Sequence, residues 1–136
     1  MKRKVESTDT LRLDSNGIQE YQKNRHPYLF VDFAEEIRPG KSARGYKNLT
    51  VNEWFFEPHF VGDPNMPGML QVEAMIQLGA LMLLTLPGNK GKTMYVVDAN
   101  RIKLARKVVP GDRLNLETKL ISWKRGIAAC TAQGSV

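Results

Sequence analysis

The feature that most constrains the fold is an apolar segment over residues 69–86, in which nearly every position carries a hydrophobic side chain. Pro87 and Gly88 end this segment, and the prolines and glycines of residues 58–68 exclude a long regular element before it. The segment is long enough for several helical turns, and a helix with no polar face must be surrounded by protein or by lipid. The surroundings of this helix therefore decide the fold.

A bilayer is the first alternative, because the length reaches the lower limit of about 18 residues for a membrane span. However, Gln71, Glu73 and Gln77 lie in the first half of the segment, and no second hydrophobic span exists to partner it. A lone carboxyl group in lipid is costly. We therefore expect a buried central helix.

The rest of the chain predicts about six strands, because it holds short runs rich in β-branched and aromatic residues between turn-forming residues. These runs cover residues 28–37, 42–51, 93–98, 101–109, 113–123 and 127–132. A sheet that wraps the helix buries all of its sides. The predicted class is α+β, with a curved antiparallel sheet around one long apolar central helix.

Length and composition indicate one domain, because 136 residues with 42% hydrophobic content can bury a core without disulfides or metals. Residues 1–15 are polar and poorly patterned, which predicts a flexible N-terminal arm. Residues 16–136 form the single predicted domain, which starts with a short helix over residues 16–23. Residues 38–41 and 124–126 have the composition of tight turns between strands.

The net charge of +6 favours an acidic partner. The lysines and arginines are scattered, and no nucleic-acid-binding motif accompanies them, so we expect no nucleic-acid partner. Cys130 is the single cysteine, and no signal peptide follows the basic N-terminus. A cytoplasmic location is therefore expected.

The loop before the apolar helix and the start of that helix carry an ordered string of motif residues: His59-Phe60, then Met66-Pro67-Gly68, then Glu73-Ala74-Met75 and Gln77. This string resembles the β-hydroxyacyl-acyl-carrier-protein dehydratases of dissociated fatty-acid synthesis. The resemblance extends over most of the chain, through residues 26–32, 48–53 and 108–112.

The resemblance implies a hotdog fold and the dehydration of (3R)-3-hydroxyacyl-acyl carrier protein to trans-2-enoyl-acyl carrier protein, in fatty-acid or related polyketide-type synthesis. It implies a homodimer with two active sites at the subunit interface, with a trimer of dimers as a further option. It implies no cofactor and no metal. The acyl carrier protein, with its phosphopantetheine-linked substrate, is the expected partner.

The chemistry needs a base for the Cα proton, an acid for the departing hydroxyl and a donor for the charge on the thioester oxygen. His59 is predicted as the base and Glu73 as the acid, because apolar surroundings favour a protonated carboxyl. The Gly68 N–H at the helix start is predicted to hold the thioester carbonyl, and Gln77 to support Glu73 across the i,i+4 spacing. The alternatives are a structural histidine, a carboxylate held by a buried partner, and a Pro-Gly turn without a catalytic role.

Four apolar motif residues are candidates for the wall of an acyl tunnel, although aromatic and methionine side chains at such positions more often form the core. They are Phe56, Phe60, Met66 and Met69.

Four basic residues are candidates for binding the acidic carrier protein, although basic residues that alternate with apolar ones are also typical of a half-exposed strand. They are Arg101, Lys103, Arg106 and Lys107. Only Arg106 breaks the alternation, so it is the most informative of the set.

Three alternative functions stay open. Gly62-Asp63-Pro64 resembles a branch of the family that also isomerises trans-2 to cis-3 double bonds, whereas Glu73 and residues 26–32 favour dehydration alone. The fold also supports acyl thioesterases and hydratases. Pro58, which stands where the relatives carry glycine or cysteine, leaves open a silent protein that only binds acyl carrier protein. The chain ends at Val136, roughly one strand before the relatives, so either a final strand is missing or the sheet edge is covered otherwise.

Overall fold

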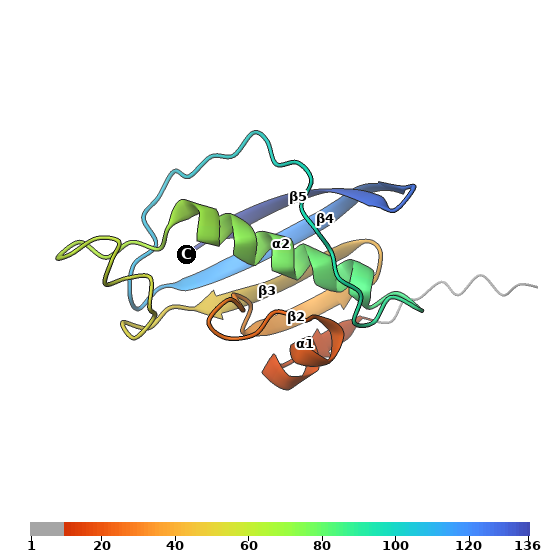
Figure 1. The fold of residues 1–136 in the computed structure, drawn as a ribbon, viewed down its shortest axis with the longest axis horizontal. Helices are drawn as coiled ribbons and strands as arrows, with labels where there is room; N and C mark the ends of the chain where they lie inside the picture. The colour runs from red at the N-terminus through yellow and green to blue at the C-terminus, as the bar shows by residue number, and fades with distance from the viewer. Residues whose placement is uncertain (1–9) are drawn as a thin grey trace, which may run out of the picture.

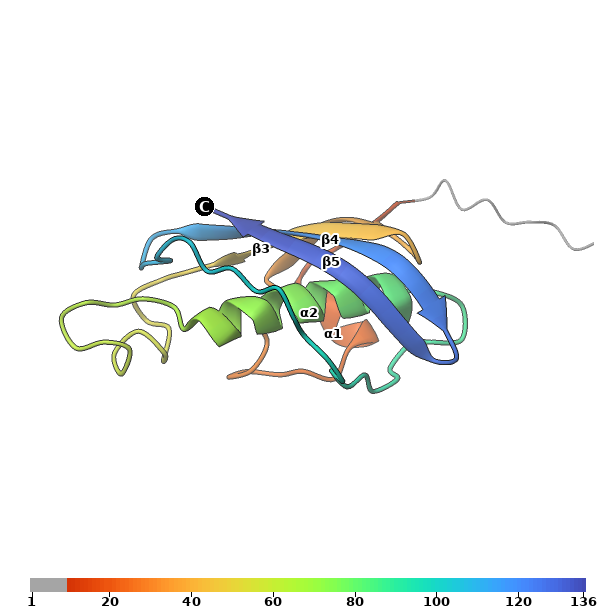
Figure 2. The ribbon, with the colours of Figure 1, turned by 90° about the horizontal axis from the view of Figure 1, so that it is seen from above.

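The computed structural model describes residues 10–136. Its centre is a five-stranded antiparallel sheet in the order β1-β2-β3-β4-β5, with one long helix, α2, packed along one face (Figures 1 and 2). The strands are β1 (Leu11–Leu13), β2 (Phe33–Arg38), β3 (Ser42–Asn48), β4 (Arg113–Lys124) and β5 (Ile127–Ser135). Figure 2 shows β4 and β5 curving over α2. The predicted α+β class, a curved sheet against a central apolar helix, is confirmed.

Helix α2 (Gly68–Leu84) begins directly after Pro67, because a proline disfavours helical backbone in the residue before it. Thr85 is its C-cap, and Pro87 follows shortly after. Its last four residues are buried, whereas Met69 in its first turn is 62% exposed. In the single chain, the second half of α2 is therefore covered as expected, whereas its first turn is partly exposed to solvent. No helix in the described part of the chain has the length and hydropathy needed to cross a membrane.

The hairpin of β2 and β3 turns at the predicted place, with Arg38 opposite Ser42 and Gly40 in the left-handed region at φ 69°. Strand β2 starts later than predicted, at Phe33. The N–H of Phe30, a residue inside the predicted strand, instead donates to the side chain of Gln77 on α2 at 2.8 Å. A backbone donor that is satisfied by a helix side chain does not need a strand partner.

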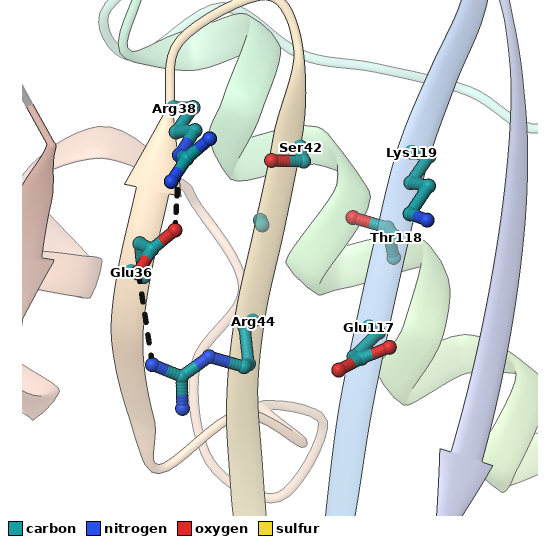
Figure 3. Close-up of a pocket in the computed structure, with 8 residues that line it drawn as sticks. Glu36, Arg38, Ser42, Arg44, Glu117, Thr118 and Lys119 are labelled. Atoms are coloured by element: carbon teal, nitrogen blue, oxygen red, sulfur yellow. Dashed lines mark ion pairs between the residues drawn. The ribbon is translucent and has the colours of Figure 1, made fainter. Parts of the chain in front are cut away.

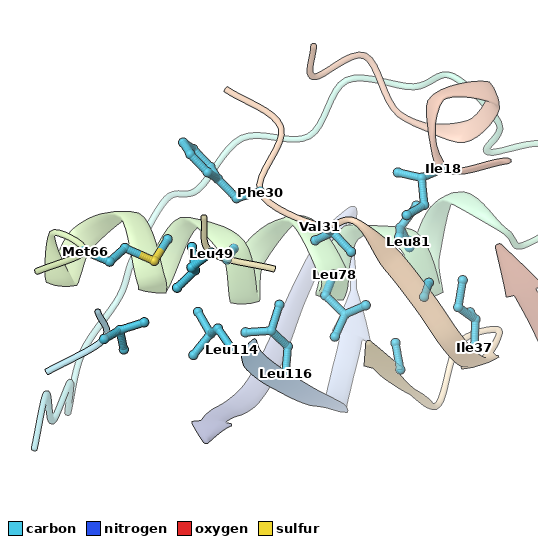
Figure 4. Packing of buried hydrophobic residues seen from close by; sticks show 14 of the residues in the cluster. Ile18, Phe30, Val31, Ile37, Leu49, Met66, Leu78, Leu81, Leu114 and Leu116 are labelled. Carbon is cyan, nitrogen blue, oxygen red and sulfur yellow. The ribbon is translucent and has the colours of Figure 1, made fainter. Parts of the chain in front are cut away.

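The core lies between the sheet and α2 and contains apolar side chains from every layer. Figure 4 shows Leu78 of α2 close to Leu116 of β4 and Val31, with Ile18 beside Leu81. Ile18 comes from the short helix α1 (Ser15–Tyr21), which Asp14 caps by accepting the Gly17 N–H at 2.8 Å. Burial of each such side chain contributes about 1.5–3 kcal/mol.

The predicted strands over residues 93–98 and 101–109 are wrong. Residues 93–109 contain no strand and arch past α2 on the side of β5 (Figure 1). Their alternating pattern identifies side chains that suit a pleated strand, but a strand also needs a neighbouring backbone. Within residues 10–136 this segment pairs with neither edge strand of the sheet, and Tyr95 is 84% exposed.

The predicted flexible arm over residues 1–15 also needs a correction at its end. Leu11–Leu13 form β1, which pairs with β2, and Asp14 caps α1. The preceding residues 1–9 lie outside the described residues, so the rest of that prediction is not addressed by the structure.

Candidate active site

The loop between β3 and α2 carries the predicted base and is fastened to the sheet at its start. Lys47 of β3 is buried, and its Nζ donates to Glu53 at 2.8 Å and to Asp32 at 3.2 Å. Phe55 and Phe56 then insert into the core. The chain therefore reaches His59 from a fixed point, although residues 49–67 contain no helix or strand.

His59 is half-buried, and its Nδ1 lies 2.8 Å from the backbone carbonyl oxygen of Asn65. A carbonyl can only accept a hydrogen bond, so Nδ1 carries the proton in the neutral ring and Nε2 keeps a lone pair. The ring of Phe60 stacks on the imidazole with 4.0 Å between the ring centroids. This arrangement leaves Nε2 as the nitrogen that can take a proton.

Glu73 is half-buried on α2 and is held by Gln77, one turn further along. The Gln77 Nε2 donates to Glu73 Oε1 at 2.9 Å and to the Tyr28 carbonyl at 2.9 Å, while Gln77 Oε1 accepts the Phe30 N–H. These three bonds fix which end of the amide faces Glu73. The hydrogen bond expected from the i,i+4 spacing is present, and it engages Oε1, so that Oε2 is the oxygen available to carry a proton.

Gly68 is the first residue of α2, so its N–H has no acceptor within the helix. The N–H groups of Leu70 and Gln71 both donate to the Pro67 carbonyl, at 2.9 and 3.1 Å. A Cβ on Gly68 would overlap the Leu104 side chain. The glycine therefore allows the segment that contains Leu104 to approach the start of α2.

The predicted base and acid are organised separately in this single chain. Among the described residues, no hydrogen bond joins His59 to Glu73. His59 depends on the loop that precedes α2, whereas Glu73 depends on Gln77 and the residues before β2.

The four candidates for a tunnel wall divide into two pairs. Phe56 and Met66 are buried members of the core, whereas Phe60 and Met69 are exposed. The first pair therefore occupies the positions expected of core packing, and the second pair faces solvent beside the predicted base and the start of α2.

The four candidate carrier-binding residues, Arg101, Lys103, Arg106 and Lys107, are all exposed on the segment that arches past α2. Lys107 Nζ is 2.8 Å from Asp63 Oδ1, so this cation is paired with the loop that carries His59. The basic segment and that loop are therefore neighbours.

A polar hollow lies on the face of the sheet away from α2, between β2, β3 and β4 (Figure 3). Glu36 pairs there with Arg38 at 3.0 Å and with Arg44 at 3.8 Å. The hollow contains none of the predicted site residues, and its acidic and basic side chains largely balance one another. We assign it to the solvent-exposed surface of the sheet.

Asn65 is a site residue that sequence reasoning missed. Its backbone accepts from the His59 ring, and its side-chain Oδ1 accepts the Val108 N–H at 3.0 Å. The available indication was an amide side chain between Pro64 and Met66 in the motif loop, because asparagine side chains in loops often bond to backbone.

The family model described as a FabA-like domain matches residues 23–136, which include the loop, α2 and most of the sheet. A 3-hydroxyacyl-acyl-carrier-protein dehydratase FabZ of Clostridium novyi (strain NT) is 52% identical over 114 residues, 84% of this chain and 80% of that protein. The dehydratase FabZ of Clostridium botulinum (strain Okra / Type B1) is 45% identical over 128 residues, 91% of this chain and 89% of that protein. Since both the domain and these relatives extend over most of the sequence, the chain belongs to the FabA-like domain family.

Proposed function

We propose that this protein is a 3-hydroxyacyl-acyl-carrier-protein dehydratase that forms the trans-2-enoyl product with His59 and Glu73 as its catalytic residues. The observation that carries the proposal is the His59 ring, whose Nδ1 is occupied by the Asn65 carbonyl at 2.8 Å, so that Nε2 is the available base. The similarity to proteins named as dehydratases supports the same reaction.

The proposed reaction removes one Cα proton and the Cβ hydroxyl of the substrate as water. His59 Nε2 takes the Cα proton, and the electron pair moves into the thioester carbonyl, where the Gly68 N–H stabilises the charge on oxygen. The electron pair then moves back from the oxygen to form the double bond between Cα and Cβ. Glu73 Oε2 donates its proton to the Cβ hydroxyl, which leaves as water. The proton on His59 later passes to Glu73 by way of solvent, which restores both groups.

A homodimer is part of the proposal, with His59 of one subunit working beside Glu73 of its partner. Two features support it: the segment over residues 93–107 exposes Tyr95, Val97 and Leu104 to solvent, and the outer edge of β5 is unpaired among the described residues. Exposed apolar side chains at an open sheet edge are typical of surfaces that a second chain covers. The separate supports of His59 and Glu73 agree with a site shared between chains.

The carrier protein is the proposed source of the substrate, and Arg101, Lys103 and Arg106 are its proposed docking residues. All three are exposed, and they precede the residues that contact the loop of His59. A cytoplasmic location belongs to the same proposal and agrees with the single cysteine of the chain.

A product assay tests the reaction. The protein is incubated with 3-hydroxyacyl-acyl carrier protein, and the products are separated by mass and by ultraviolet absorbance. We expect the trans-2-enoyl carrier protein. Release of a free acid would instead identify a thioesterase, a cis-3 product would identify an isomerising enzyme, and unchanged substrate would identify a protein that only binds the carrier.

A further inference from the structure

The direction of the His59 ring depends on one carbonyl group, and that group belongs to an irregular loop. A base is effective only when its nitrogen is held toward the proton, because small misplacements cost much of the rate. The Asn65 carbonyl supplies this hold by accepting the Nδ1 hydrogen at 2.8 Å. Whatever fixes Asn65 therefore fixes the base.

Asn65 is tied to the His59 backbone as well as to its ring. The Asn65 N–H donates to the His59 carbonyl at 2.8 Å, so the two residues are joined by two hydrogen bonds. These bonds keep Asn65 and His59 together but do not attach the pair to the rest of the protein.

The attachment is made by the side chain of Asn65. Its Oδ1 accepts the Val108 N–H at 3.0 Å, and the next residue, Met66, donates its N–H to the Val108 carbonyl at 2.8 Å. The amide oxygen thus takes the place of a backbone carbonyl in a short ladder. Both polar groups of the Val108 backbone are occupied by the loop.

Val108 is a firm anchor because it is 3% exposed and belongs to the core. The turn after it is also tied down: Val109 N–H donates to Asp112 Oδ2 at 3.0 Å, and Leu49 N–H donates to the Asp112 carbonyl at 3.0 Å. The anchor therefore connects to the end of β3 and the start of β4.

The ion pair between the loop and this segment is weaker than the hydrogen bonds to Val108. Lys107 and Asp63 form an ion pair whose side chains are 59% and 63% exposed. Exposed pairs of this kind contribute little. We propose that Asn65 is a positioning residue, whose side-chain oxygen holds the loop on Val108 and thereby keeps the His59 ring in the tautomer with Nε2 unprotonated. The kinetic part of this inference rests on the proposed function, and the spectroscopic part does not.

The test compares three variants by nitrogen-15 NMR of the histidine rings, at a pH where imidazole is neutral. The chain has two histidines, so His26 serves as an internal reference in every spectrum. Asn65→Leu (N65L) and Asn65→Asp (N65D) both keep the approximate shape of asparagine, but only the aspartate variant retains a side-chain acceptor at this position. Asn52→Leu is the matched control, because Asn52 is exposed in the same loop.

We expect one His59 tautomer, with hydrogen on Nδ1, in the wild-type protein, in N65D and in the Asn52 control. N65L should show a mixture of tautomers, with the His26 signals unchanged. Turnover of a short 3-hydroxyacyl pantetheine thioester should fall between about tenfold and a hundredfold in N65L, with KM little changed, because the loss is in the transition state. N65D should recover most of this loss.

An unchanged tautomer in N65L would overturn the inference, and so would equal losses in N65L and N65D, since the acceptor would then not be the cause. If N65L does not fold, hydrogen exchange of the Val108 amide in the wild-type protein decides, and rapid exchange would overturn the inference. A protein without dehydratase activity whose tautomer still depends on Asn65 would overturn the proposed function alone. Normal dehydration with an unchanged tautomer would overturn this inference alone.

Discussion

At the scale of single residues, the two proposed catalytic groups are prepared in different ways. His59 depends on a backbone carbonyl at 2.8 Å, whereas Glu73 depends on a side chain, Gln77, that is itself fixed by two further hydrogen bonds. A backbone acceptor cannot be deleted by a side-chain substitution, although its position can depend on a side chain, here that of Asn65. A side-chain donor can be removed by one substitution, so the two supports can be tested separately.

His59→Ala should lower dehydration of a 3-hydroxyacyl thioester by about 10²-fold or more, because it removes the base for the Cα proton. The rate is measured by the absorbance of the enoyl product. His26→Ala is the matched control, because His26 is exposed and lies outside the motif, and it should retain wild-type turnover. Turnover close to wild type in His59→Ala would remove His59 from the mechanism.

Glu73→Gln should also lower the rate by about 10²-fold while the protein stays folded, because the new amide oxygen still accepts from Gln77. Gln77→Leu is the comparison, since it breaks the bonds to Phe30 and Tyr28 as well and should destabilise the fold by about 1–3 kcal/mol. Thermal unfolding separates the two effects. An unfolded Glu73→Gln protein would indicate that the carboxyl is a structural partner.

At the scale of elements, two glycines lie where α2 packs on the sheet, and their surroundings differ. A Cβ on Gly45 of β3 would overlap the Phe33 carbonyl oxygen and lie 3.2 Å from Leu78 of α2. A Cβ on Gly79 of α2 would meet only Thr118, at 3.8 Å. One glycine is required by its neighbours, and the other has room for a methyl group.

Gly45→Ala should therefore destabilise the protein by about 1–3 kcal/mol, because backbone has to move. Gly79→Ala should stabilise it by about 0.5–1 kcal/mol, because alanine favours the helix and the space is available. Denaturant unfolding measures both changes. The same sign for both variants would mean that the packing of α2 on β3 differs from the structure.

Arg106→Glu should weaken the use of carrier-bound substrate much more than the use of a short pantetheine thioester, because it reverses a charge on the proposed docking segment. Added salt should weaken wild-type carrier binding in the same direction. Lys41→Glu is the matched control, on the turn between β2 and β3, and should affect neither substrate. Equal losses on both substrates with Arg106→Glu would assign Arg106 to the fold or to the acyl site.

The sequence predicts those elements whose signals are local. Helix α2 and the turn at Gly40 follow from apolar composition and from Pro-Gly chemistry, and the Glu73–Gln77 bond follows from helical spacing. Residues 93–109 could not be predicted in the same way, because a strand depends on a partner that the local pattern does not specify. Asn65 was missed for a related reason, since Val108, which its side chain contacts, is 43 positions away.

At the scale of the whole molecule, the shared site of the proposed homodimer makes a prediction that a single subunit cannot. His59→Ala and Glu73→Gln homodimers each have two defective sites. A mixed dimer has one site with both defects and one site with wild-type His59 and wild-type Glu73 from different chains. Random exchange makes about half of the dimers mixed, so roughly a quarter of wild-type activity should return.

The mixing experiment is measured with the same enoyl assay after subunit exchange has been verified by mass spectrometry of the dimers. Each mutant mixed with itself is the control and should stay inactive. If exchanged dimers recover no activity, both groups act within one chain, and the proposed interface has to be redrawn.

The outer edge of β5, which is unpaired among residues 10–136, also bears on how the protein can be produced. An unpaired strand edge is a template on which other extended chains can pair. If the proposed homodimer forms, a newly synthesised subunit either pairs with a second subunit or aggregates with other nascent chains, and the relative rates of the two processes set the yield. The yield of recoverable protein from an expression culture should rise when translation is slowed by cooling, and fall when synthesis is fastest.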